Sequence, residues 1–186
     1  MKDIAAVRAN VSQEDALRQF AGGIAGRIAY AIFGPLKTLA QVYVPFELFE
    51  VRITNNGTEQ LSVVGLEAVN GVMDLFHFEM KSLERQRVQV PTRNHLKPVL
   101  DKSLGSRIVQ DKVRRALYGK GFWTLRRCSI AVKPLDEILY VPYWLGFRGR
   151  GPQARISAID AVRRQFEGAK LRQLVTHHLS RNAIPA

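Results

Sequence analysis

The chain has 186 residues, of which 46% are hydrophobic and 24% charged, and its formal net charge is +12. This composition excludes a fully disordered chain or a low-complexity array, and the length fits one ordinary domain or two small ones. The single cysteine, Cys128, excludes an internal disulfide framework and a multi-cysteine metal site, a usage typical of a reducing compartment.

The first residues, 1–5, contain no apolar core of signal-peptide length after a basic start, so we expect a cytoplasmic location. The most hydrophobic stretch, 24–33, is interrupted by Gly26 and Arg27 and ends at Gly34-Pro35. It is shorter than the roughly 20 apolar residues that a membrane-spanning helix requires. No transmembrane segment is therefore expected.

The first periodic segment predicts a helix over residues 12–22. Ser12 with Asp15 three residues later forms a variant of the capping box, and Gly22-Gly23 would end the helix. Residues 27–33 then alternate larger and smaller side chains, which predicts a strand. The alternative is a helix that continues to Phe33, but the corresponding part of the second half of the chain favours the strand.

Four antiparallel strands are expected to follow in the first half. After the turn at Gly34-Pro35, one strand runs through Tyr43-Val44-Pro45-Phe46. Asn55-Asn56-Gly57 is a strong hairpin signal between residues 48–53 and 60–69, and Asn70-Gly71 is a second one before residues 72–79.

Residues 80–106 are expected to connect the halves, with Pro91 and Pro98 breaking regular structure. The second half then predicts a helix over 107–118, closed by Gly119-Lys120-Gly121, and aromatic and β-branched strands at 122–125 and 128–132. A short hairpin tip at 148–152 and a longer turn at 163–168 come later. The last element, 170–182, fits a terminal helix, with a strand as the alternative.

The two halves share a collinear pattern at an offset near one hundred residues. The matching positions are Gly22 with Gly119, Pro35-Leu36 with Pro134-Leu135, Tyr43–Phe46 with Tyr140–Tyr143, Leu48 with Leu145, and Ala68-Val69 with Ala161-Val162. We therefore predict an α+β fold built by tandem duplication of a helix followed by an antiparallel sheet of about four strands. The predicted units are 1–79 and 107–186, joined by 80–106, and they should share a core because each alone is marginally small.

The predicted helix, the strands and one turn together resemble a known family. The turn is Glu67-Ala68-Val69-Asn70-Gly71, and less fully Asp160-Ala161-Val162, which lacks the glycine. The arrangement is similar to PepSY-type or cystatin-like modules over residues 11–79 and, more loosely, 108–175. The resemblance implies a sheet that wraps one helix and a non-catalytic binding or inhibitory role, and it carries no catalytic residues across.

The net charge is confined to the second half of the chain. Residues 1–93 hold ten Lys/Arg and ten Asp/Glu, whereas residues 94–186 hold eighteen and six. Such a basic half attracts polyanions, and arginine, which predominates, suits planar contacts to phosphate or carboxylate. The predicted binding residues are Arg107, Lys112, Arg114, Arg115, Lys120, Arg126, Arg127, Arg148, Arg150, Arg163 and Arg164.

Candidate catalytic and metal-binding residues are few. The adjacent His177 and His178 cannot both face one metal ion from a helix, Cys128 fits a small buried hydrophobe, and no nucleophile has an assignable base. Tyr118, Phe122 and Trp123 could stack on bases but are more typical of a core. No cofactor and no metal are expected.

Taken together, these patterns favour a non-enzymatic binding or accessory module. Its basic second half would hold nucleic acid, another anionic surface or an acidic protein, and its neutral first half would supply a scaffold or a homo-oligomer surface. The alternative is a structural subunit of a larger assembly whose basic face is covered by a neighbour. A third hypothesis, an enzyme with an unfamiliar site, would need a polar pocket with clustered titratable groups.

Overall fold

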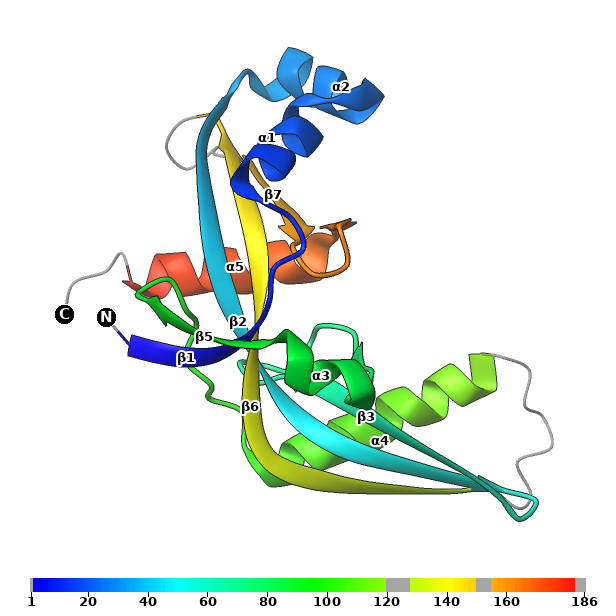
Figure 1. The fold of residues 1–186 in the computed structure, drawn as a ribbon. Coiled ribbons are helices and arrows are strands. Elements are labelled where there is room, and N and C mark those ends of the chain that lie inside the picture. The colour runs from blue at the N-terminus through cyan, green and yellow to red at the C-terminus, as the bar shows by residue number, and fades with distance from the viewer. Residues whose placement is uncertain (1, 120–127, 150–154, 183–186) are drawn as a thin grey trace.

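The computed structural model describes residues 2–119, 128–149 and 155–182, and its fold is a mixed α+β arrangement (Figure 1). The described elements, in chain order, are β1 (Lys2–Val7), α1 (Gln13–Ala21), α2 (Gly23–Phe33), β2 (Leu36–Asn55), β3 (Thr58–Glu67), β4 (Phe76–Phe78), α3 (Met80–Gln86), β5 (Arg87–Thr92), α4 (Lys102–Gly119), β6 (Cys128–Arg148), β7 (Arg155–Asp160), β8 (Gln165–Glu167) and α5 (Ala169–Asn182). The strands form one mostly antiparallel sheet in the order β4-β3-β2-β6-β1-β5, with β7 paired to β6 and β8 to β7.

Two long strands, β2 and β6, form the spine of the molecule (Figure 1). They pair antiparallel from Leu36 opposite Arg148 to Asn55 opposite Cys128. Near the middle of this pairing Val44 lies opposite Val141, so the two Tyr-Val-Pro segments run past each other in opposite directions. Tyr43 then faces Pro142, and Pro45 faces Tyr140.

Each spine strand continues into a second strand that ends in a buried carboxylate. One carboxylate oxygen of Glu67 accepts hydrogen bonds from the backbone N–H groups of Val69 and Asn70. In the other half, Oδ1 of Asp160 accepts from the N–H groups of Val162 and Arg163, at 2.8 and 2.9 Å. In both halves the residue directly after the carboxylate donates its backbone N–H to a carbonyl of the spine. Ala68 donates to Pro45 at 2.8 Å and Ala161 donates to Pro142 at 3.1 Å.

The hairpin predicted at Asn55-Asn56-Gly57 is confirmed. Asn56 and Gly57 have φ values of 48° and 81°, as a tight hairpin turn requires, and β2 pairs with β3 from the turn back to Phe46 opposite Glu67. Gly71, at φ 70°, supports the second turn, and Asn70 Oδ1 accepts from the Val72 N–H. The strand after it is shorter than the predicted 72–79, since β4 covers three residues.

The capping box at the first helix is also confirmed, because Ser12 Oγ accepts from the Asp15 N–H and the Asp15 carboxylate accepts from the Ser12 N–H. The strand predicted over 27–33 is wrong, because this segment is helix α2. Gly22, in an extended conformation, ends α1, and the chain then begins a new helix. The alternative of a helix reaching Phe33 is the correct one, with a break at Gly22.

The segment 80–106 is more regular than expected, because it contains α3, β5 and the start of α4. Pro91 does not break β5, since β5 lies at the edge of the sheet, where a missing N–H is tolerated. The helix predicted over 107–118 begins five residues earlier, at Lys102. The Asp101 carboxylate accepts from the N–H groups of Ser103 and Leu104 at its start.

The remaining predictions for the second half have mixed outcomes. The strand at 128–132 is part of β6, and the terminal helix is α5. The long turn at 163–168 is wrong, because residues 165–167 form β8 and pair with β7. The strand predicted at 122–125 lies outside the described residues.

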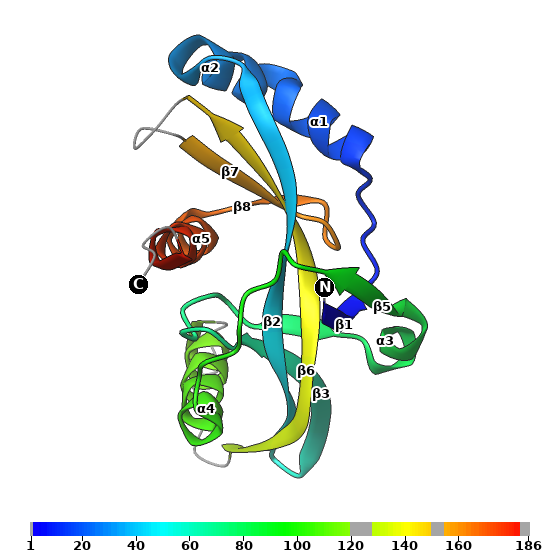
Figure 2. The ribbon, with the colours of Figure 1, turned by 90° about the vertical axis from the view of Figure 1, so that its left-hand side faces the viewer.

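One apolar cluster joins both halves of the chain. It contains Val44 and Phe46 of β2, Val141 and Tyr143 of β6, and Leu171 of α5. A second cluster packs α4 against the distal part of the sheet through Val109 and Val113. The view in Figure 2 places α4 and α5 on the same side of the spine, with β1, β5 and α3 on the other.

Candidate polyanion-binding surface

Helix α4 contributes three exposed arginines from the predicted set, Arg107, Arg114 and Arg115. Its apolar residues Val109 and Val113 are buried against the sheet, which leaves the basic residues on the solvent side. Arg114 lies 3.7 Å from the Asp111 carboxylate, whereas Arg107 and Arg115 make no ion pair among the described residues. Two fully charged guanidinium groups are therefore available to a ligand on this helix.

Lys112 of the same helix is held differently. Its side chain is half-buried, and its Nζ donates a hydrogen bond to the carbonyl of Met73 at 2.8 Å. Burial lowers the pKa of Lys112 below its ordinary value of 10.5, although the nearby Asp74 opposes this shift. Lys112 therefore fixes the loop between β3 and β4 against α4 as well as adding positive charge.

The loop between β3 and β4 brings the two basic helices together. Lys112 and Arg115 of α4 and Lys170 of α5 line one hollow of about 350 Å³ with Asp74 and His77. Lys170 Nζ lies 2.5 Å from Asp74 Oδ1. The basic side chains of α4 and α5 thus adjoin one another on the side of the spine seen in Figure 2.

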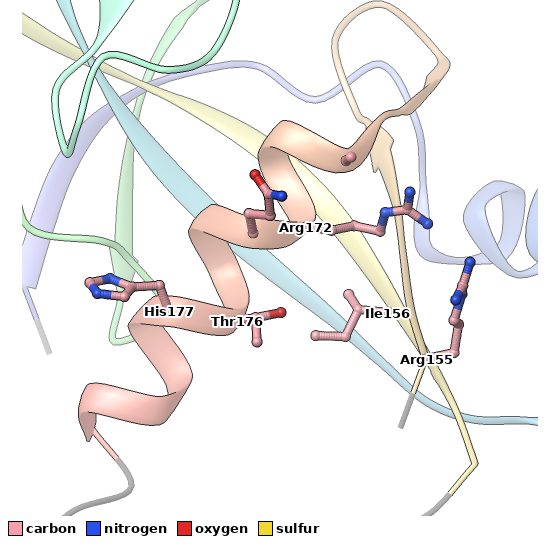
Figure 3. Close-up of a pocket in the computed structure, with 7 residues that line it drawn as sticks. Arg155, Ile156, Arg172, Thr176 and His177 are labelled. Atoms are coloured by element: carbon pink, nitrogen blue, oxygen red, sulfur yellow. The ribbon is translucent and has the colours of Figure 1, made fainter. Parts of the chain in front are cut away.

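A second, more open hollow of about 510 Å³ lies between β7 and α5 (Figure 3). The side chain of Arg172 on α5 extends toward Arg155 on β7, and Thr176 and His177 line the hollow from further along the helix. The Arg155 guanidinium also lies 4.8 Å from the centre of the Phe33 ring. In the part of the chain that the structure describes, neither arginine makes an ion pair.

We define the α4–α5 surface by the basic residues of these two hollows and of the exposed side of α4. They are Arg107, Lys112, Arg114, Arg115, Arg155, Lys170 and Arg172. Arg155, Lys170 and Arg172 were missing from the predicted set. A sequence signal for them does exist, since all three lie in the half of the chain that carries the net charge.

The turn between β7 and β8 carries Arg163 and Arg164, both exposed. The Arg163 guanidinium lies 3.7 Å from the centre of the Phe76 ring, and its Nε is 4.0 Å from Asp160 Oδ2. Arg163 is therefore engaged with the protein, whereas Arg164, at φ 60°, projects from the turn.

Arg148 is not the exposed hairpin-tip residue that the sequence predicts. Its side chain is 3% exposed, and its guanidinium donates to the carbonyls of Phe20 at 2.7 Å and Gly34 at 2.9 Å. The end of α1 and the turn before β2 lie over this part of β6 and enclose the side chain. The predicted residues Lys120, Arg126, Arg127 and Arg150 lie outside the described residues.

A third hollow, of about 360 Å³, gathers titratable groups beside the spine. Its lining includes Tyr143, Arg163, Glu167 and Lys170, with Asp160 buried next to them. Burial raises the pKa of Tyr143 well above 10, and burial, then the charge of Asp160, raises the pKa of Glu167 above 4.5. The Tyr143 phenol therefore stays protonated. Arg163 and Lys170 line the same hollow as the Glu167 carboxylate. None of the lining residues is a serine, cysteine or histidine, so this hollow holds no Ser–His or Cys–His pair, but its clustered titratable groups are the feature that the enzyme hypothesis requires.

A metal site and a membrane-spanning helix are both absent from the residues that the structure describes. No group of three or more His, Cys, Asp or Glu side chains there is arranged to hold a metal ion. Of the helices in the described ranges, none combines the length and the apolar composition needed to cross a bilayer.

Comparison of the chain with protein-family models, with curated protein sequences and with solved structures finds no significant match.

Proposed function

We propose that the protein is a non-enzymatic binding module that holds a polyanion, with nucleic acid as the ligand to test, on its α4–α5 surface. The observation that carries the proposal is the placement of two basic helices on one side of the sheet. Together α4 and α5 contain eight Lys/Arg and one Asp. The opposite side carries α3, β1 and β5, where acidic and basic residues are mixed.

Binding would depend on charge more than on base identity. Each phosphate that an arginine neutralises releases condensed counterions, so affinity falls steeply as salt is added. Arg107, Arg115, Arg155 and Arg172 supply the strongest contacts because no carboxylate of the described residues pairs with them. Their guanidinium groups match the geometry of phosphate oxygens.

The test is a titration of double-stranded and single-stranded DNA of mixed sequence at about 50 mM and about 200 mM salt. Wild-type protein should bind at low salt and weaken at least tenfold at high salt. The variant Arg107→Glu/Arg115→Glu/Arg172→Glu should lose most of this binding. Its matched control reverses three exposed arginines elsewhere, Arg8→Glu/Arg85→Glu/Arg93→Glu, with the same change in net charge.

Two outcomes would contradict the proposal. The first is the absence of binding by the wild-type protein at low salt. The second is an equal loss in the control variant, which would mean that net charge alone, and not the α4–α5 surface, attracts the ligand.

We also infer that the halves descend from one duplicated unit of the PepSY-type or cystatin-like kind. The opposed Tyr-Val-Pro segments and the matched hydrogen bonds of Glu67 and Asp160 support this inference. In such a lineage the neutral half would serve as scaffold while the basic half acquired the ligand. A protein of this kind would act in the cytoplasm and needs no cofactor.

A further inference from the structure

Helix α2 directs its largest apolar side chains into solvent. Ile24 is 78% exposed, Ile28 54% and Ile32 65%. The three isoleucines are spaced four residues apart and therefore form one stripe along the helix. On the other side of the helix, Gly26 is buried against the end of α1 and Phe33 is half-buried.

This orientation is the reverse of an ordinary surface helix, which turns its apolar stripe toward the core. A contiguous apolar stripe on a surface marks a site that another apolar phase covers. Helix α2 lies at the outer end of the molecule, beyond the end of β2, in both views of the ribbon (Figures 1 and 2).

The charges on α2 and on the residues that flank it in the sequence are all of one sign. The sequence contains no Asp or Glu between Asp15 and Glu47, whereas Arg27 lies on α2 itself and Lys37 follows it at the start of β2. Arg155 lies over the Phe33 ring at the end of the helix. The surface thus combines an apolar stripe with surrounding cations.

This combination separates the occupants that could cover the stripe. A second copy would bury the isoleucines but would bring Arg27 and Lys37 of both copies close together, in a chain of net charge +12. An anionic bilayer offers an apolar phase and negative headgroups at once. We propose that α2 docks the protein on an anionic membrane surface, with the Ile24, Ile28 and Ile32 side chains inserted among the lipids and Arg27 at the headgroups.

The test is co-sedimentation of the full-length protein with vesicles of phosphatidylcholine alone or mixed with phosphatidylglycerol. Wild-type protein should bind the mixed vesicles and not the neutral ones, and should bind less at high salt. The variant Ile28→Gln/Ile32→Gln should bind at least about tenfold more weakly, because it places two polar side chains where the bilayer would otherwise bury two isoleucines. The control Leu61→Gln/Val99→Gln removes two residues that are 56% and 70% exposed elsewhere, and should bind within about twofold of wild type.

The docking is overturned if wild-type protein fails to bind the anionic vesicles, or if the α2 variant binds them as well as wild type does. In the second case the basic α4–α5 surface alone would hold the membrane. It is also overturned if wild-type protein is a dimer in sedimentation analysis and the α2 variant is a monomer, since a second copy would then cover the stripe. Equal unfolding midpoints for the two variants separate these results from misfolding. DNA binding is a separate measurement, so either proposal can fail alone.

Discussion

Arg148 is expected to stabilise the fold and to contribute nothing directly to ligand binding. The residue ends β6, and its two terminal nitrogens donate separately, Nη1 to Gly34 and Nη2 to Phe20. It thereby fastens the end of α1 and the turn before β2 to the spine. Arg148→Met keeps most of the apolar stem and removes both donors.

The size of the effect follows from the number of bonds and the burial. A hydrogen bond from a charged donor contributes about 1.5–3 kcal/mol, and two are lost here. Part of that loss is offset, because the variant no longer takes a charge out of water. We expect a net loss of about 2–4 kcal/mol in the free energy of unfolding. For a chain of this length that lowers the melting temperature by roughly 4–16 °C.

The assay is thermal unfolding followed by circular dichroism, with DNA titration below the melting temperature. Arg93→Met, at an exposed position directly after β5 and outside the α4–α5 surface, is the control and should change stability by less than about 0.5 kcal/mol. Arg148→Lys should recover little, because a single ammonium group does not reproduce the fork that reaches two carbonyls. If Arg148→Met has the melting temperature of wild type but binds DNA poorly, the reasoning is refuted and Arg148 contacts the ligand directly.

Two further predictions concern carboxylates inside the fold, the buried Glu67 and Asp160 and the half-buried Glu167. Glu67→Ala and Asp160→Ala should each lower the free energy of unfolding by about 2–4 kcal/mol, because each removes the acceptor of two backbone N–H groups. Chemical denaturation measures this loss, and unchanged stability at either position would contradict equivalent roles for the two carboxylates. The pKa of Glu167 is raised above 4.5, so the folded protein holds this proton more tightly than the unfolded chain and loses stability as pH rises from 4.5 through the folded pKa. The melting temperature of Glu167→Gln relative to that of wild type should therefore increase as pH rises across that window. For the exposed control Glu84→Gln the same difference should not change with pH. A melting-temperature difference for Glu167→Gln that decreases with pH would contradict the prediction.

Local chemistry allowed several features to be predicted from the sequence. The capping box at Ser12 and the Asn56-Gly57 hairpin depend on side chains and dihedral angles within four residues, so tertiary structure had little to add. The apolar spacing of residues 170–182 indicated a helix, with a strand left as the alternative, and the structure forms the helix α5, in which Leu171 and Leu174 are buried.

Features that depend on a distant partner were missed. The stretch 27–33 satisfies both strand and helix periods, and in the structure it forms the helix α2 and packs against α1. Arg148 stands beside glycines in a basic run that is typical of an exposed tip, yet α1, more than a hundred residues earlier, covers it. The α4–α5 surface has the same origin, because Arg155 and Arg172 meet only after β7 and α5 pack together.

Charged residues at buried turns and charged residues on the exposed helices α4 and α5 serve different purposes. Glu67 and Asp160 are both buried and occupy the same kind of turn in the two halves, where each carboxylate accepts hydrogen bonds from two backbone N–H groups. Those positions are therefore constrained by folding in both halves. The exposed positions of α4 and α5 carry no such constraint, since an uncharged polar residue would serve the fold equally well there. An excess of arginine at positions that folding leaves free, on one side of the sheet, is better explained by a negatively charged partner than by stability.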